Sequence, residues 1–534
     1  MAQDSKAPPE IEKAFQTTFK LIFGECNLKL DDIGEYLFRW HYPPHNRESS
    51  ISGKPVIVSS DFYRKDAKFI SQDEIDFGKK SEPLGIDDIK DIDSIVAAIQ
   101  ERDLVYYSGN KIFGNSSNVS ESDNCTDAAH TYKSHNITGA RYVAYSSYVR
   151  FESEYIFGSG WFLRSRYLIK SLGADNLTRA FETYLTGNCS DMFFCYYCMG
   201  CSHLMFSFNQ RLKKYCIGNN QLSKDQYLAL REKLVAESRE YLEKHKTFPS
   251  IFDFGEMDET KRQKLLTKAP KKIKREEDVA PIEKAFKSTA TVIFGTDIGG
   301  LEENKKFLTQ RAVIPEEITT FFGNPTCYGQ VFFFNQIPKN RMITGDEELA
   351  CSELRIDINE NDGLTSILSR LGDIALYRID LSEGTANNAI NNPIMYNAIN
   401  SYFVVDLTFG KNCAFCTYAL NDESVFGCYR TIHSKFIIRC ENSYNLTACF
   451  EMDGCSNCSN SMFCHNSENL DHCMFCFNTK SKRYAIANVE VGREKYVQIR
   501  ERVLAELVRQ IKEGRKLKWN IYNLGCKQGN TRSK

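Results

Sequence analysis

Cysteine and histidine residues in two parts of the chain have spacings that a zinc site can use. The first group comprises Cys189, Cys195, Cys198, Cys201 and His203, and the second comprises Cys455, Cys458, Cys464, His472, Cys473 and Cys476. Structural zinc takes four thiolate or imidazole ligands, commonly in pairs two or three residues apart. Zinc is therefore the first cofactor to weigh.

Aligning the two groups argues for a different role. When each residue is aligned with the one whose number is higher by 269, Cys195 corresponds to Cys464 and His203 to His472, but Cys198 corresponds to Ser467 and Cys201 to Leu470. Serine and leucine cannot replace a zinc-bound thiolate, whereas they can replace a cysteine that packs in a core. The comparison favours packing, with zinc as the alternative.

A cysteine beside a histidine could also act as a nucleophile. Cys195 with His203, or Cys464 with His472, has the residue types of a thiolate–imidazolium pair. The sequence contains no nucleophile elbow, phosphate loop or dinucleotide fingerprint to accompany such a pair. We predict no catalytic residue from these motifs.

Two basic segments are candidate contacts for nucleic acid. One contains Lys271, Lys272, Lys274 and Arg275, and the other is the tail from residue 527 to 534. The first runs directly into Glu276, Glu277 and Asp278, and the whole chain has 68 basic against 69 acidic residues. Charge runs of this kind usually lie in solvated linkers, so the linker interpretation is favoured and nucleic acid is the alternative.

The cysteines of the later part follow a period of three. Those at positions 413, 416, 428, 440, 449, 455, 458, 464, 473 and 476 all leave the same remainder on division by three. A strand alternates every two residues, and steps of three drift around a helix, so neither explains the period. A β-solenoid, whose coils send slim side chains inward at a fixed step, does explain it. The pattern predicts a cysteine-lined solenoid.

Internal similarity indicates that one unit occurs twice. The segment Ile11 to Phe15 recurs as Ile282 to Phe286, at a shift of 271. Residues 176–219 and 445–488 align without a gap at a shift of 269, with 19 identities in 44 positions. Repeats at nearly one shift predict a tandem duplication.

The predicted organisation follows from these repeats. Each copy has an α+β front end (1–110 and 282–385), a β-solenoid (111–221 and 386–490) and a capping helix (222–256, and 491–534 with the basic tail), and 257–281 is a charged linker. Apolar spacing predicts a first helix that ends at Gly24, and Ser223 with Gln226 predicts a capping box. Segments 54–59 and 330–334 are predicted strands, and 103–107 matches 373–377.

One segment supports a family resemblance. Lys213, Tyr215, Cys216, Ile217, Asn219, Gln221, Ser223, Lys224 and Tyr227, after the cysteine repeats, resemble a group of cysteine-rich bacterial proteins that often bear the label "CaiB/BaiF family protein". The chain has no coenzyme A transferase pattern, and the resemblance implies no activity or catalytic residue. In the second copy Ala485 stands for Cys216.

Composition and termini restrict the compartment and the function. The first ten residues lack an apolar signal region, and no apolar stretch is long enough to span a membrane. We expect a cytoplasmic protein with its 20 cysteines reduced. We predict a non-enzymatic scaffold for self-assembly or a protein partner, including a component of a virion. The alternatives are a zinc-stabilised nucleic-acid- or ribosome-associated protein, and an enzyme whose groove would need a buried carboxylate pair with shifted pKa values.

Overall fold

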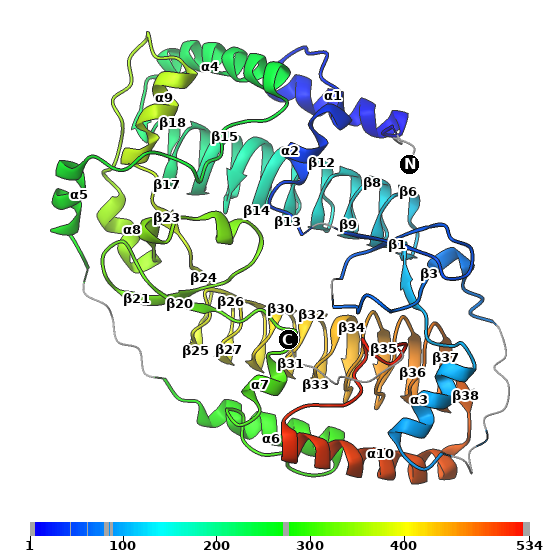
Figure 1. The fold of residues 1–534 in the computed structure, drawn as a ribbon. Helices are drawn as coiled ribbons and strands as arrows, with labels where there is room; N and C mark the ends of the chain where they lie inside the picture. Colours follow the sequence, from blue (N-terminus) through cyan, green and yellow to red (C-terminus); the bar gives the residue numbers. More distant parts are fainter. Residues whose placement is uncertain are drawn as a thin grey trace.

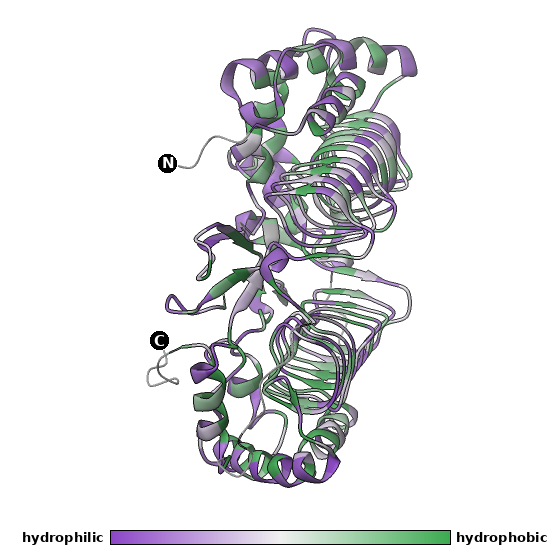
Figure 2. Ribbon diagram, turned by 90° about the vertical axis from the view of Figure 1, so that its right-hand side faces the viewer, coloured by the Kyte–Doolittle hydropathy of each residue, from purple (hydrophilic) through white to green (hydrophobic). Residues whose placement is uncertain are grey.

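The computed structural model describes residues 6–42, 44–60, 62–78, 85, 89–270 and 277–526. Each half of the chain contains a mixed α/β front segment, a large and predominantly parallel β-sheet, and a long helix after the sheet. Figure 1 shows the two sheets side by side, with helices along the outer side of each. Figure 2 shows that both sheets curl back on themselves.

The first half contains α1 (Pro9–Phe23), α2 (Gly34–Phe38), α3 (Ile92–Glu101), α4 (Lys224–His245) and α5 (Glu259–Leu266). Its small pairs are β1 (His45–Glu48) with β2 (Pro55–Val58), and β3 (Phe69–Ser71) with β4 (Tyr107–Gly109). Its large sheet consists of β5 (Ile112–Phe113), β6 (Ser117–Ser120), β7 (Asp123–Thr126), β8 (Ala129–Tyr132), β9 (His135–Thr138), β10 (Arg141–Ala144), β11 (Ser147–Arg150), β12 (Glu154–Phe157), β13 (Gly160–Leu163), β14 (Arg166–Tyr184), β15 (Gly187–Met199), β16 (Ser202–Met205), β17 (Phe208–Arg211), β18 (Lys214–Ile217) and β19 (Asn220–Gln221).

The second half contains α6 (Ala280–Phe294), α7 (Lys305–Leu308), α8 (Gly345–Cys351), α9 (Leu364–Arg370) and α10 (Arg493–Gly514). Its small pairs are β20 (Glu316–Thr319) with β21 (Pro325–Tyr328), and β22 (Met342–Ile343) with β23 (Tyr377–Arg378). Its large sheet consists of β24 (Leu381–Glu383), β25 (Asn387–Ile390), β26 (Ile394–Tyr396), β27 (Ile399–Tyr402), β28 (Asp406–Thr408), β29 (Lys411–Ala414), β30 (Thr417–Leu420), β31 (Glu423–Phe426), β32 (Tyr429–Ile432), β33 (Lys435–Ile438), β34 (Glu441–Thr447), β35 (Ser456–Ser459), β36 (Glu468–Met474), β37 (Lys480–Ile486) and β38 (Val489–Glu490).

Strand pairing in both large sheets follows a nearly constant register. Most paired Cα atoms differ by 12 in residue number, as Cys413 and Val425 do. The difference is 13 at a few places, as for Arg141 with Glu154. All described pairs in these sheets are parallel except the last of each, β18 with β19 and β37 with β38. Each half therefore closes its sheet with a short antiparallel turn before the long helix begins.

The backbone explains the period of three in the cysteines. Along the sheets, roughly every third residue has positive φ, including Asn412 (57°) and Asn457 (53°). Cys413 and Cys458 directly follow these residues and are buried. Asparagine tolerates the left-handed conformation better than most residues, which accounts for its frequency there. A repeat of two extended residues and one left-handed residue thus turns every third side chain into the sheet interior.

The predicted helices pack on the outer sides of the sheets. Helix α1 ends before Gly24 and buries Phe15, Phe19 and Ile22 against the first sheet. The predicted capping box at the start of α4 is confirmed, because Ser223 accepts from Gln226 N–H and Gln226 from Ser223 N–H. Figure 1 places α10 along the second sheet as it places α4 along the first.

Parts of the front segments pack against the opposite half of the chain. Tyr63 Oη donates to Asp453 Oδ2 at 2.7 Å, and Ile92 N–H donates to Glu506 Oε2 at 3.1 Å. In the other direction Tyr196 Oη donates to Arg378 O at 2.7 Å, and Leu364 N–H donates to Glu237. Figure 1 shows α3 beside α10 and α9 near α4. The parts of the front segments near Tyr63 and Ile92, and near Leu364 and Arg378, therefore contact the opposite half, whereas α1 and α6 pack on the sheet of their own half.

Of the two local strand predictions, one is wrong and one is confirmed. Residues 332–336 form a 3-10 helix rather than a strand, with Val331, Phe333 and Phe334 fully buried. Tertiary burial, rather than pairing, accommodates the aromatic run. The predicted strand at 54–59 is β2, and only the ends of 103–107 and 373–377 enter strands, at Tyr107 and Tyr377. Within the described residues, no helix is long and apolar enough to cross a membrane.

Candidate ligand pocket between the two sheets

A half-open pocket of about 410 Å³ lies between the two large sheets. Strands β11, β13, β14 and β15 line one side, and β24, β26, β28 and β30 line the other. Ligand sites typically occupy roughly 300–1,000 Å³ and prefer the boundary between structural units, so both the size and the place suit a binding site. We refer to this cavity as the central pocket.

Trp161 forms one wall of the central pocket. The residue lies in β13, and Gly173 lies in the adjacent strand β14. A Cβ atom on Gly173 would lie 3.1 Å from the Trp161 ring and 2.8 Å from Leu185. Gly173 also has φ of +70°, which suits glycine. This glycine leaves the space that the indole ring occupies.

Asp406 in β28 connects the two sheets across the pocket. Its Oδ2 accepts a hydrogen bond from Trp161 Nε1 at 3.0 Å. Burial raises the pKa of Asp406 to about 6, and the positive charge of Arg150 and the Trp161 and Thr408 hydrogen bonds oppose this rise. The carboxyl group can therefore change its protonation state near neutral pH.

Arg150 supplies the positive charge of the central pocket. Burial lowers the pKa of its guanidinium, and Asp406 is its main electrostatic partner. Among the described residues, none forms a hydrogen bond or an ion pair within 4.0 Å with the Arg150 side chain. The side chain is half-buried, so its five N–H donors remain accessible to solvent or to a bound ligand.

One carboxylate oxygen of the pocket wall is buried without a hydrogen-bond partner in the described part of the chain. Asp175 Oδ1 is buried, and no described residue forms a hydrogen bond with it. Burial raises the pKa of Asp175, and the positive charge of Arg164 partly offsets that rise. Leaving a buried polar atom unsatisfied costs about 1–3 kcal/mol, so this oxygen suits a donor on a bound molecule.

Thr186 also contributes to the pocket wall, but its hydroxyl belongs to the sheet interior. Its Oγ1 is buried and has no hydrogen-bond partner among the described residues. Thr186 stands one step of three before Cys189, which packs in the interior cluster of the first sheet. We therefore do not assign its hydroxyl to the central pocket.

Aromatic rings surround the entrance of the pocket. Phe409 is 52% exposed, Phe151 46% and Tyr396 39%. Deeper in, Tyr148 and Tyr418 lie with ring centroids 5.4 Å apart. Exposed rings beside a cavity with a few polar groups are typical of ligand sites.

The cysteines and histidines weighed as possible nucleophile pairs have separate environments. Cys195 is fully buried and its thiol donates to the carbonyls of Phe193 (3.3 Å) and Leu204 (3.6 Å). His203 is half-buried on the outer side, with Nε2 3.8 Å from Asp191 Oδ2. In the other half Cys464 is buried, whereas His472 contacts Asp471 at 2.7 Å.

The remaining predicted metal ligands also lie in the sheet interior. Cys189, Cys198, Cys201, Cys455, Cys458, Cys473 and Cys476 are all buried free thiols. Many donate to backbone carbonyls, and Cys189 Sγ accepts from Cys201 N–H at 3.2 Å. Burial raises the pKa of Cys464 to about 12 and of Cys216 to about 11. Among the described residues no group of three or more histidine, cysteine or acidic side chains is arranged to hold a metal ion.

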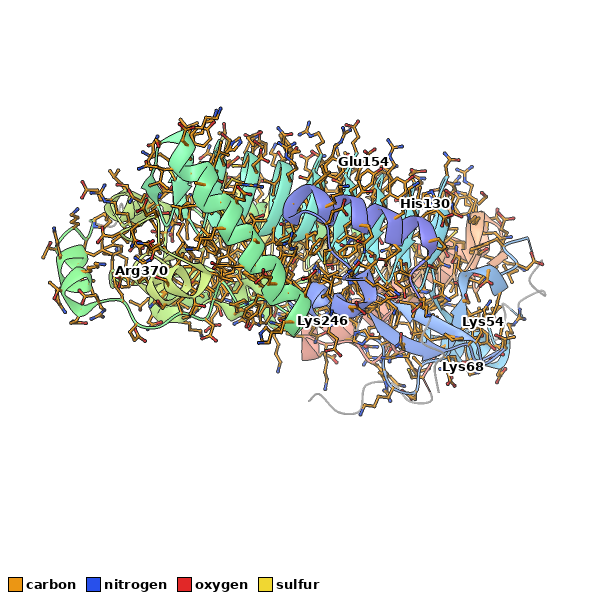
Figure 3. All side chains as sticks on the ribbon, turned by 90° about the horizontal axis from the view of Figure 1, so that it is seen from above. Lys54, Lys68, His130, Glu154, Lys246 and Arg370 are labelled. Carbon is orange, nitrogen blue, oxygen red and sulfur yellow. The ribbon has the colours of Figure 1, made fainter. Side chains whose placement is uncertain are left out.

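The predicted nucleic-acid contacts cannot be placed. Lys271, Lys272, Lys274, Arg275 and the tail 527–534 all lie outside the described residues. Figure 3 shows basic side chains such as Lys54, Lys68 and Lys246 at separate places on the surface. Nucleic-acid binding through the two basic segments stays a prediction.

Sequence reasoning did not find the central pocket. Its residues come from strands more than 200 positions apart in the chain, such as those of Trp161 and Asp406, and no local motif links them. The alignment of the halves was the available signal, because it predicted two sheets that would have to meet somewhere. Their relative placement depends on tertiary contacts.

Comparisons with protein-family models, with curated proteins and with solved structures found no match to this chain. The resemblance of residues 213–227 to the cysteine-rich bacterial group therefore stays a prediction, and the pocket has to be interpreted from its own chemistry.

Proposed function

We propose that the protein is a non-enzymatic binding scaffold, in which two solenoid modules hold a small ligand in the central pocket between them. In this proposal each large sheet is a cysteine-lined solenoid whose coils repeat at the constant strand register, and the two modules descend from one duplicated unit. Solenoids commonly present extended binding surfaces, and a pair of them can enclose a site.

Equivalent contacts in the two halves support the duplication. Tyr107 Oη donates to Ile521 O at 2.8 Å, and Tyr377 Oη donates to Ile251 O at 2.6 Å. The two tyrosines differ by 270 in residue number, and so do the two acceptors. Asn209 and Asn478 likewise donate at 2.8 Å to Leu376 O and Tyr106 O of the opposite half.

One observation carries the binding function: the central pocket combines a half-open cavity of about 410 Å³ with polar groups, Arg150 and Asp175 Oδ1, that have no hydrogen-bond partner among the described residues. Asp175 Oδ1 is buried, and protein interiors rarely leave such an atom unsatisfied without a functional reason. The half-buried Arg150 keeps its donors accessible to a ligand. A protein partner or a second copy could add to this role, and the proposal places the primary ligand in the pocket.

Filling the pocket tests the proposal. Thr408 and Ile432 occupy equivalent positions in two strands of the second sheet, because each pairs with Leu420 in the strand between them. Thr408 lines the pocket and Ile432 does not. The probe is 8-anilinonaphthalene-1-sulfonate, which fluoresces in apolar cavities. We expect Thr408→Trp to abolish saturable probe binding and Ile432→Trp to preserve it. Equal binding by the two variants would refute a pocket function.

Acid–base catalysis in the same pocket is a second candidate. Asp175 and Asp406 both line the cavity, and burial raises the pKa of both. Carboxyl groups tuned in this way act as general acids. The test is release of 4-nitrophenol from 4-nitrophenyl glycosides, which we would expect Asp406→Asn to abolish. No release by the purified chain would leave binding as the function.

A further inference from the structure

The polar groups of the central pocket restrict the chemistry of its ligand. Arg150 offers donors without a described acceptor, whereas Asp175 Oδ1 lacks a described donor. A complementary ligand must therefore present an acidic oxygen pair to one part of the pocket and a hydroxyl or N–H donor to another. Guanidinium groups bind carboxylates and phosphates through paired hydrogen bonds.

The charge balance favours an acid with one negative charge. Three carboxyl groups line the pocket, Asp175, Glu383 and Asp406, against the single guanidinium of Arg150. A ligand with several phosphate charges would bring them close to these carboxylates and would be repelled. One carboxylate can pair with Arg150 without that penalty.

The rings define the body of the ligand. Trp161 lies within the pocket, and Phe409, Tyr396 and Phe151 stand partly exposed at its entrance. These rings offer apolar surface to a ligand, and Asp175 offers it a polar atom. The hydroxyl-bearing ring of a sugar has both kinds of surface, since its C–H face is apolar and its hydroxyls project from the edge.

We propose that the central pocket binds an acidic sugar, with its carboxylate on Arg150, a hydroxyl donating to Asp175, and its C–H face against Trp161. This inference rests on the proposed binding function and names its ligand class. Because the pocket is half-open, a longer saccharide that carries one such acidic residue at its end extends past Phe409 and Tyr396.

A matched pair of trisaccharides tests the inference on the full chain. The acidic probe is a β-1,4-linked trisaccharide of two glucose residues with one glucuronic acid at the non-reducing end, so it carries a single carboxylate, and the neutral probe is the β-1,4-linked trimer of glucose. The two differ only at C6 of the terminal residue, which is a carboxylate in one and a hydroxymethyl group in the other, so titration calorimetry measures what that carboxylate contributes. We expect the neutral trimer to bind at least tenfold more weakly, because it loses the charged hydrogen bonds to Arg150.

Two further measurements assign the binding to the pocket. The chain has three tryptophans, so the double variant Trp40→Phe, Trp519→Phe leaves Trp161 as the only indole reporter. The acidic trimer should change its fluorescence, and Thr408→Trp should abolish binding to the otherwise unaltered chain. Arg150→Met should bring the acidic and neutral trimers within about twofold of each other, with circular dichroism confirming the fold.

Each outcome decides between the two proposals. If neither trisaccharide displaces the anilinonaphthalene probe while Thr408→Trp still abolishes probe binding, the acidic-sugar proposal is wrong and the pocket function stands. Equal affinity for both trimers, or tighter binding of uridine monophosphate than of the acidic trimer, would also overturn the acidic-sugar proposal. Probe binding unaffected by Thr408→Trp would remove the pocket function itself.

Discussion

The buried cysteines behave as apolar packing residues with weak hydrogen-bonding capacity. All 20 are free, and 19 of them are buried, with Cys26 as the half-buried exception. Compact thiols pack closely in a narrow interior. The interior clusters of both sheets combine these thiols with leucine, valine and methionine.

Thiol accessibility follows from this arrangement. Under reducing, native conditions we expect a disulfide reagent such as 5,5′-dithiobis(2-nitrobenzoic acid) to react slowly with Cys26 alone, because burial and Glu243 raise its pKa to about 11. Denaturation should release all 20 thiols. Cys26→Ser should remove the native reaction. Rapid native reaction of several thiols, or stoichiometric zinc by elemental mass spectrometry, would contradict the packing role.

Asp406 makes stability depend on pH in a defined direction. Its folded pKa of about 6 lies above the usual value, so between roughly pH 4 and 6 the folded state keeps a proton that the unfolded state loses. Stability therefore falls as pH rises through this window. The difference in unfolding free energy between Asp406→Asn and the parent, measured by urea unfolding, should rise by up to about 3 kcal/mol from pH 4 to pH 7. Parallel pH profiles for the two proteins would contradict this assignment.

At the scale of the element, side chains at equivalent positions of neighbouring strands form a row in the sheet interior. A row that contains serines shows why different small side chains can occupy such positions. Ser146 Oγ donates to Ala144 O at 2.8 Å and accepts from Ser159 N–H at 3.1 Å. In another row Cys189 Sγ accepts from Cys201 N–H in the same way. The row position therefore requires a small acceptor rather than one residue type.

Substitutions at Ser146 test this requirement. Ser146→Ala leaves the buried Ser159 N–H without an acceptor and should cost about 1–3 kcal/mol of unfolding free energy. Ser146→Cys keeps an acceptor and should cost less. Ser117, an exposed residue of β6, is the control, and its change to alanine should have an effect below about 0.5 kcal/mol. A larger loss for cysteine than for alanine would show that the row does not work this way.

At the scale of the whole molecule, the parts of the front segments that contact the opposite half hold the halves together. Contacts from residues 63–108 reach the second sheet and the segment after α10, and contacts from residues 348–378 reach the first sheet and α4. Buried ion pairs add to the second half's own packing, since Arg311 contacts both Glu441 and Glu451. Neither half buries its own surfaces alone.

Cleavage between the halves tests this dependence. A protease site inserted between residues 270 and 277 of the full chain allows the backbone to be cut after folding. We expect the fragments to co-elute on size-exclusion chromatography and to separate only under denaturing conditions. The N-terminal fragment, expressed without the C-terminal one, should be unstable, because its interface with the second half would be exposed to water. Dissociation of the cut, native protein would show that these contacts contribute little.

The sequence by itself determined the local repeat and the elements that flank it. The period of three appears in the cysteines because every turn of the backbone imposes the same inward step, as at Cys413 and Cys458. The helix stop at Gly24 and the capping box at Ser223 are likewise local, so short-range chemistry reveals them. The sequence could not tell inward cysteines from metal ligands except through the mismatch of Cys198 and Cys201 with Ser467 and Leu470.

Only the tertiary structure decided where the sheets meet and which half each front segment covers. The contact of Trp161 with Asp406, and of Tyr63 with Asp453, joins residues hundreds of positions apart. Hydrophobic burial is non-directional, so the apolar face of a front segment fits either sheet equally well at the level of sequence pattern. The choice between them depends on the sum of many distant contacts, and the central pocket exists only where that choice brings β13 and β28 together.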